Sequence, residues 1–134
     1  IVTATYGNQT SSTSSTFADT GLTATITPES GSSRILILAC QTGVGKLGGN
    51  DTMCKLRLLR DSTAIVDPFE PYGGYTASAA SSIVGACCVI YSDAPGVVTA
   101  TTYKTQFASN LNLPTAYVQV AGSISSIALI ETAV

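Results

Sequence analysis

The sequence predicts an all-β fold: a single-domain antiparallel β-sandwich, jelly-roll-like, with about eight to ten strands. Short runs rich in Val, Ile, Thr and Tyr recur along the chain, separated by clusters of Gly, Pro, Asn, Asp and Ser. No segment carries the apolar stripe of an amphipathic helix. The 134 residues suffice for one domain with a real core, and no linker or internal repeat divides residues 1–134.

The first half of the chain is predicted to contain four strands. Val2 to Tyr6 alternates apolar and hydroxyl residues, and Leu22 to Ile26 alternates apolar residues with threonines, as half-buried strands do. Arg34 to Cys40 is apolar on both faces, which is typical of a central strand inside a sandwich. Met53 to Arg60 interleaves apolar residues with cations, which indicates one covered face and one wetter face. Pro28 to Ser33 is predicted to be a loop.

The second half repeats these patterns. Its predicted strands are Thr63 to Val66, Ile83 to Tyr91 (again apolar and β-branched), Val97 to Phe107, Ala116 to Val120 and Ile124 to Ile130. Turns rich in Asp, Asn, Pro and Gly lie between most of them.

Three other segments have a specific interpretation. The Ser/Thr tract from Gln9 to Thr16 is interpreted as a flexible segment or a hydroxyl-rich edge strand, and Asp19 with Gly21 suits a turn or bulge. Residues Gly43 to Gly48 match G-x-G-x-x-G, but a strand pattern follows in place of the helix that a dinucleotide site needs. Leu47 also stands where a Walker loop needs Ser or Thr. We therefore predict a flexible glycine hairpin loop here.

Charge excludes several partners. Six cations against eight anions give a net charge of −2, and the cations are scattered, so no nucleic-acid footprint is expected. No apolar run approaches the ~20 residues needed for membrane insertion. Charged residues make up 10% of the chain, against about a quarter in soluble domains. Because such a surface gains little solubility from charge repulsion, we expect copies of the chain or a partner to cover part of it.

The sequence also argues against catalysis. It has no His, so Ser-His-Asp and Cys-His nucleophile systems are impossible. Its four cysteines lack the paired C-x-x-C spacing of zinc sites. Asp67 and Glu70 are the only close acidic pair in a predicted loop, and nothing in the sequence suggests a substrate cleft beside them. We predict no enzymatic activity, no cofactor and no metal.

The cysteines are predicted to be buried free thiols. Cys87 and Cys88 are adjacent, so in a strand they point to opposite faces. A pair between Cys40 and Cys54 stays open as the one disulfide that a hairpin could form.

The segment from Asp67 to Tyr75 is the candidate recognition loop. It holds the aromatic residues Phe69, Tyr72 and Tyr75 between two prolines and two glycines. Aromatic side chains on a rigid segment provide contact area at low entropy cost. The alternative is that these aromatic side chains fold back over one end of the sandwich.

Five segments carry a resemblance to a known family: Thr13 to Pro28, Ser32 to Ile37, Leu56 to Ile65, Thr101 to Gln106 and Ser125 to Glu131. Together they resemble a small β-sandwich structural module of tailed-bacteriophage virions, of the capsid-decoration (cement) or tail-fibre-tip type. The segments Gly43 to Asn50 and Pro68 to Tyr75 depart from the shared pattern. The resemblance implies a β-sandwich that forms homotrimers and attaches to other virion parts.

Two functions follow from the resemblance. The first is a non-enzymatic capsid decoration protein, which is assembled in the bacterial host cytoplasm. It binds the major capsid protein on the head exterior and stabilises the head through symmetric contacts. The short chain favours this function. The alternative is a trimeric receptor-binding tip of a tail fibre, which contacts a host-surface receptor through Phe69, Tyr72 and Tyr75. A signalling jelly roll of a non-viral kind is supported by the fold prediction alone.

Overall fold

Alternation of apolar and polar residues along most of the chain produces strands with one covered face. The computed structural model describes residues 1–112 and 114–133, and this described part contains ten strands and one 3-10 helix. In chain order they are β1 (Val2–Tyr6), β2 (Thr10–Ser12), β3 (Ala18–Ile26), β4 (Arg34–Leu47), β5 (Thr52–Arg60), β6 (Thr63–Thr76), β7 (Ser82–Asp93), β8 (Thr101–Ser109), β9 (Thr115–Val118), η1 (Val120–Gly122) and β10 (Ser125–Thr132).

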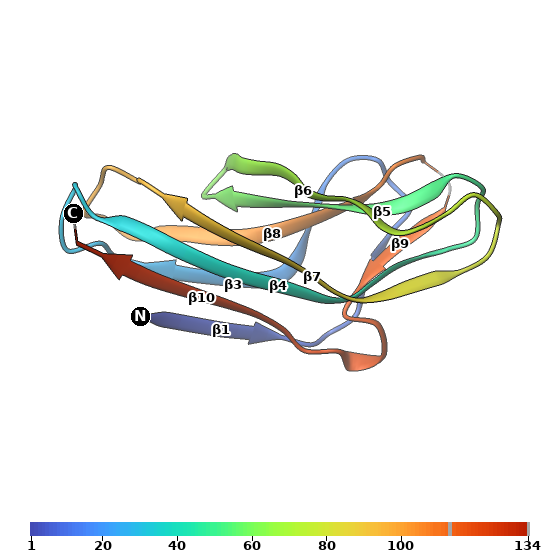
Figure 1. Ribbon diagram of the computed structural model, residues 1–134, viewed down its shortest axis with the longest axis horizontal. Coiled ribbons are helices and arrows are strands. Elements are labelled where there is room, and N and C mark those ends of the chain that lie inside the picture. The colour runs from blue at the N-terminus through green and yellow to red at the C-terminus, as the bar shows by residue number, and fades with distance from the viewer. Residues whose placement is uncertain (113, 134) are drawn as a thin grey trace.

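The strands form two antiparallel sheets that pack face to face (Figure 1). The six-stranded sheet has the order β1-β10-β4-β7, with β9 and then β2 paired beside the far end of β4. The four-stranded sheet has the order β3-β8-β5-β6. The chain passes repeatedly from one sheet to the other, and the eight strands other than β2 and β9 have the order of a jelly roll. The predicted antiparallel sandwich of jelly-roll type is confirmed.

β4 is longer than the sequence indicated. β4 continues through Gly43 to Leu47, so the predicted glycine hairpin loop is mostly strand and only the turn from 48 to 51 remains. The prediction was wrong because Gly43 has φ 55° and lies against η1, where an added Cβ would come within 2.5 Å of the Val120 nitrogen. Glycine here allows close packing of η1 and does not give a flexible loop.

The expected bulge in β3 is confirmed. The register between β3 and β8 shifts between Asp19 and Thr23. Gly21 at this shift has φ 93°, and the ring of Tyr6 from β1 occupies the space that a side chain would need. The bulge therefore brings β1 of one sheet close to β3 of the other.

The interior contains two hydrophobic clusters with polar side chains between the sheets. The larger cluster includes Leu22, Ala24, Ile26, Ile35, Ile37, Ala39, Leu58, Tyr103, Ile127 and Leu129. The smaller cluster includes Val44, Cys54, Leu56, Cys87, Phe107, Ala116 and Val118.

A buried network of side-chain hydrogen bonds links the two sheets. The Thr105 hydroxyl donates to the side-chain carbonyl of Gln41 at 2.9 Å, and the Gln41 amide donates to the Ser125 hydroxyl at 2.9 Å. Thr20 shares a 2.6 Å hydrogen bond with Thr105. Because a buried amide without partners is costly, this network favours the one relative position of the sheets that satisfies it.

A second buried polar group fixes the end of β7. Arg60 of β5 donates to both carboxylate oxygens of Asp93 at 3.0 and 2.9 Å, and the Tyr103 hydroxyl of β8 donates to the same carboxylate at 2.8 Å. Burial of the Tyr103 ring and its hydrogen bond to Asp93 raise the pKa of the phenol. These contacts attach β7 to the four-stranded sheet across the core.

Candidate interaction surfaces

The outer face of the four-stranded sheet carries paired charges. Lys104 lies 2.9 Å from Asp19, and Arg57 lies 3.1 Å from Asp67. The guanidinium of Arg57 also stacks over the ring of Phe17, 4.1 Å from its centroid. Partial burial raises the pKa of Asp19, but hydrogen bonds from Gln106 and Lys104 outweigh it, so this pKa lies below its ordinary value.

The outer face of the six-stranded sheet has no charged residue along its middle. Alternation along β1, β10, β4 and β7 and their register place on it Thr3, Thr5, Leu36, Leu38, Cys40, Ala86, Cys88, Ile90, Ser126, Ala128 and Ile130. Arg34 stands at one end of this face, where it donates to Ser92. We call these eleven residues the uncharged face.

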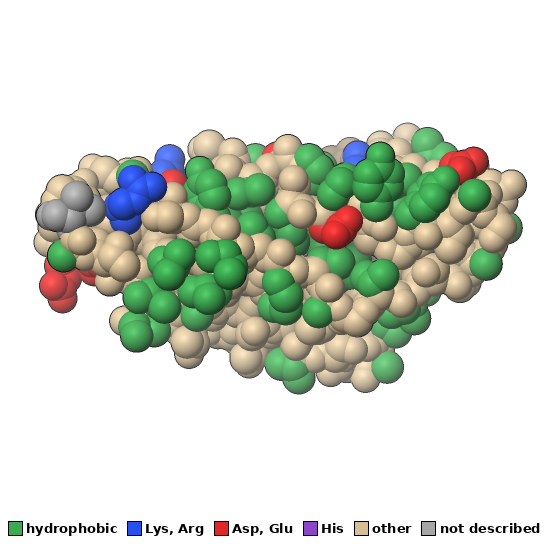
Figure 2. Space-filling view, in the orientation of Figure 1, with side chains coloured by type: hydrophobic (Ala, Val, Ile, Leu, Met, Phe, Trp, Pro, Cys, Tyr) green, Lys and Arg blue, Asp and Glu red, His purple; other side chains and the backbone are tan. Residues whose placement is uncertain are grey.

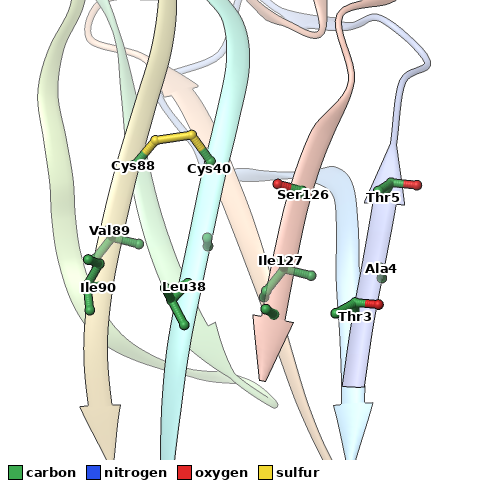
Figure 3. A pocket seen from close by; sticks show the side chains of 12 residues that line it. Thr3, Ala4, Thr5, Leu38, Cys40, Cys88, Val89, Ile90, Ser126 and Ile127 are labelled. Atoms are coloured by element: carbon green, nitrogen blue, oxygen red, sulfur yellow. A yellow bond between two sulfur atoms is a disulfide. The ribbon is translucent and has the colours of Figure 1, made fainter. Parts of the chain in front are cut away.

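A shallow hollow of about 440 Å³ crosses the uncharged face. Figure 3 shows Leu38, Ile90 and the Cys40–Cys88 pair on one side of it, with Thr3 and Thr5 of β1 on the other. Apolar carbon and hydroxyl groups line the hollow, and it contains no ionisable side chain. Its lining offers apolar contact area and hydroxyl groups, and no ionisable acid or base.

Hydrophobic side chains gather visibly on this side of the molecule. Figure 2 shows green patches over the region that β4, β7 and β10 occupy in Figure 1. Blue and red groups lie near the end where the chain terminates, and other charged groups lie at mid-length and toward the opposite end. On the uncharged face, the exposed fractions of Ile90 and Leu38 are 71% and 37%. A contiguous exposed apolar patch is a candidate interaction surface.

The cysteines differ from the prediction. Cys40 and Cys88 form a disulfide between β4 and β7, so neither the prediction of free thiols for this pair nor the possible Cys40–Cys54 bond is correct. Cys40 lies directly opposite Cys88 in the register, with both side chains on the uncharged face. The sequence could not reveal this, because it does not specify which strand pairs with β4.

The other two cysteines are buried free thiols, as predicted. Cys54 and Cys87 both lie in the smaller hydrophobic cluster. Burial raises the pKa of Cys54 well above its usual range; burial and then the nearby Glu70 raise the pKa of Cys87 to about 11. Both thiols are therefore protonated at neutral pH and are poor nucleophiles or metal ligands.

The candidate recognition loop is not a loop. Residues 67–75 belong to β6, which pairs with β5 through several register shifts. Phe69 is half-buried and packs against both hydrophobic clusters, so this ring folds back over the core, as the alternative prediction has it. The register shifts explain the long strand, because bulges accommodate prolines and glycines that a regular ladder excludes.

Tyr72 and Tyr75 do project outward from β6. Their exposed fractions are 64% and 43%, and their rings meet edge to face with centroids 6.0 Å apart. The Tyr75 hydroxyl donates to Asp51 at 2.8 Å, and this hydrogen bond raises the pKa of the phenol. The structure therefore retains two of the three predicted recognition residues as an exposed aromatic pair.

Groups of three or more His, Cys, Asp or Glu side chains that could hold a metal ion do not occur among the described residues. In the same part of the chain, no helix has the length and apolar character needed to span a bilayer.

Comparison with known proteins identifies no family for this chain. No protein-family model matches the sequence, and no curated protein is similar to it. Among solved structures, the chain is similar to the infectious bursal disease virus VP2 subviral particle, with a TM-score of 0.46 and 13% sequence identity. The match covers 98% of this chain and 42% of that chain, so this chain spans less than half of the other's length.

Proposed function

We propose that this protein is a non-enzymatic structural component of a bacteriophage virion, and specifically a capsid decoration protein that binds the exterior of the head. The observation that carries the proposal is the contrast between the two sheets: one outer face bears ion pairs, and the other is uncharged and hollowed. A surface of the second kind gains free energy when a partner covers it.

Two further features support the proposal. The strand-and-turn segments that resemble phage virion modules are distributed along the chain from Thr13 to Glu131. Jelly rolls also build many viral shells, although a fold by itself does not specify a function. In this proposal the charged face of the four-stranded sheet stays in solvent, and the uncharged face lies against the major capsid protein or another copy of the chain.

The test uses heads of the encoding phage that lack this protein. The purified protein is added to these heads, and co-sedimentation measures how much of it binds. We expect saturable binding in a fixed ratio to the shell protein. Ser126→Lys places a cation on the exposed centre of the uncharged face and should abolish this binding. Thr25→Lys, on the outer face of the four-stranded sheet, is the matched control and should bind like the wild type.

Two results would refute the proposal. One is that wild-type protein fails to sediment with heads, and the other is that Ser126→Lys and Thr25→Lys bind equally well. Heads carrying the protein should also resist heat better than heads without it, because each bound copy stabilises the assembled shell.

The exposed pair Tyr72 and Tyr75 supports a second function, a receptor-binding tip of a tail fibre. Exposed aromatic residues on a rigid strand suit weak ligands such as surface sugars, and several copies displayed together would raise the avidity. Here Tyr72→Ala should reduce attachment to host cells, whereas Val98→Ala, an exposed apolar residue beyond the far end of β7, should not. Equal attachment of both variants, with saturable head binding, would eliminate this alternative.

A further inference from the structure

The free edge of β7 lacks the features that usually protect an edge strand. β7 is 12 residues long, and its pairing in the described part of the chain is with β4 alone. From Ser82 to Ser92 it contains no Lys, Arg, Asp, Glu or Pro. Ile83 and Ile90 on this strand are 53% and 71% exposed. A long apolar edge is a template on which another strand can pair.

The other edges of the sandwich are protected. β6 carries Asp67, Pro68, Glu70 and Pro71 and several register shifts. β3 carries Asp19 and the bulge beside it. β1 and β2 are only five and three residues long. Charges, prolines, bulges and shortness are the means by which natural sheets prevent edge pairing. Among these five edge strands, only β7 has a long stretch, Ser82 to Ser92, with none of them.

We propose that the free edge of β7 pairs with β7 of a second copy of this chain, antiparallel about a two-fold axis, so that the six-stranded sheet continues across a dimer. The beginning of β7 lies against β6, where an added Cβ on Gly74 would come within 2.8 Å of the Ser82 carbonyl oxygen. The pairing stretch is therefore the exposed remainder of the strand, up to Ser92.

A second copy suits this edge for two reasons. Antiparallel pairing about a two-fold axis makes the contact isologous, so each strand meets its own sequence in reverse. Since this stretch has no charged residue, self-pairing brings no like charges opposite one another. A partner with a charged strand would leave those charges without counterparts on β7.

The pairing also extends the uncharged face. Ala86, Cys88 and Ile90 point outward from β7 onto that face. In the dimer the two uncharged faces become one continuous surface on one side of the joined sheets. The contact does not depend on binding to a phage head, so it can be tested on the purified protein alone.

The experiment is sedimentation-equilibrium analysis of the wild type, of Ile90→Lys and of Thr3→Lys over a wide range of concentrations. We expect a wild-type dimer whose dissociation constant rises at least about tenfold in Ile90→Lys, because the substitution places a cation on each strand of a contact that otherwise carries no charge. Thr3→Lys lies on β1, at the opposite edge of the same sheet, and should leave the dimer unchanged. Circular dichroism checks that each variant is folded.

Hydrogen exchange provides a readout that needs no substitution. The β7 amides that face the partner should exchange more slowly as the wild-type concentration rises, while β1 and β6 amides should not change. A monomer at every concentration, a trimer, or a dimer disrupted by Thr3→Lys and not by Ile90→Lys would each overturn the proposal. A dimer that fails to bind heads would support this contact and refute only the proposed decoration function.

Discussion

The disulfide between Cys40 and Cys88 gives a prediction with a definite magnitude. The two residues are 48 positions apart in the sequence. Closing a loop of that length in the unfolded chain lowers its entropy enough to stabilise the folded state by about 4 kcal/mol at 25 °C. Reducing the bond, or replacing both residues in Cys40→Ala/Cys88→Ala, should therefore lower the free energy of unfolding by about 4 kcal/mol.

The assay is urea unfolding followed by circular dichroism, with and without a reductant. For the wild type the midpoint should fall sharply on reduction. The Cys40→Ala/Cys88→Ala variant is the matched control: its midpoint should equal that of the reduced wild type and should not respond to the reductant. A thiol titration in denaturant should find only Cys54 and Cys87 reactive before reduction.

Two outcomes would refute this reasoning. Reaction of all four cysteines in the unreduced protein would show that the pair is not bonded. The second outcome is that the thiol titration finds the bond in the unreduced protein, but the urea midpoint of the wild type does not change when the bond is reduced. This would show that cross-linking β7 to β4 does not restrict the unfolded chain as the loop length requires.

Three further predictions concern single side chains. Tyr103→Phe should lower the free energy of unfolding by about 1.5–3 kcal/mol, measured by urea denaturation, because the hydroxyl donates to the buried carboxylate of Asp93. Phe69→Ala should lower it by about 2–3 kcal/mol, since the ring packs against both clusters, whereas exposed Tyr72→Ala should have little effect. The pKa of Asp19 lies below its ordinary value of 3.8, so its ionised form stabilises the fold above that pH and the contribution is lost as the pH falls through the lowered pKa. Asp19→Asn should therefore flatten the acid limb of a stability-against-pH curve, and an unchanged limb would contradict this assignment.

Local patterns in the sequence predicted most of the strands. The range Val2 to Tyr6 matches β1, and the run that begins at Arg34 starts β4, since alternation and β-branched residues act over a few neighbouring positions. Strand ends were less predictable where a tertiary contact replaced the local signal. Gly43 is a turn residue by propensity, yet β4 continues through it because η1 packs against it.

The candidate site was predicted only in part. Tyr72 and Tyr75 are exposed as expected, but Phe69 on the same strand faces the core. The register shifts of β6 decide which of these rings points inward, and no local pattern specifies a bulge at an individual residue.

The sequence by itself determined the class of fold, the low charge and the absence of histidine, because composition and the two-residue period of a strand are properties of the chain alone. The tertiary structure decided which strands are neighbours. It made the apolar stretch of β7 an exposed edge, joined Cys88 to Cys40, and separated a charged face from an uncharged one. The physical reason is that strand pairing is non-local: a residue's own neighbours specify which way its side chain points, and only the packed sheets specify what it meets there.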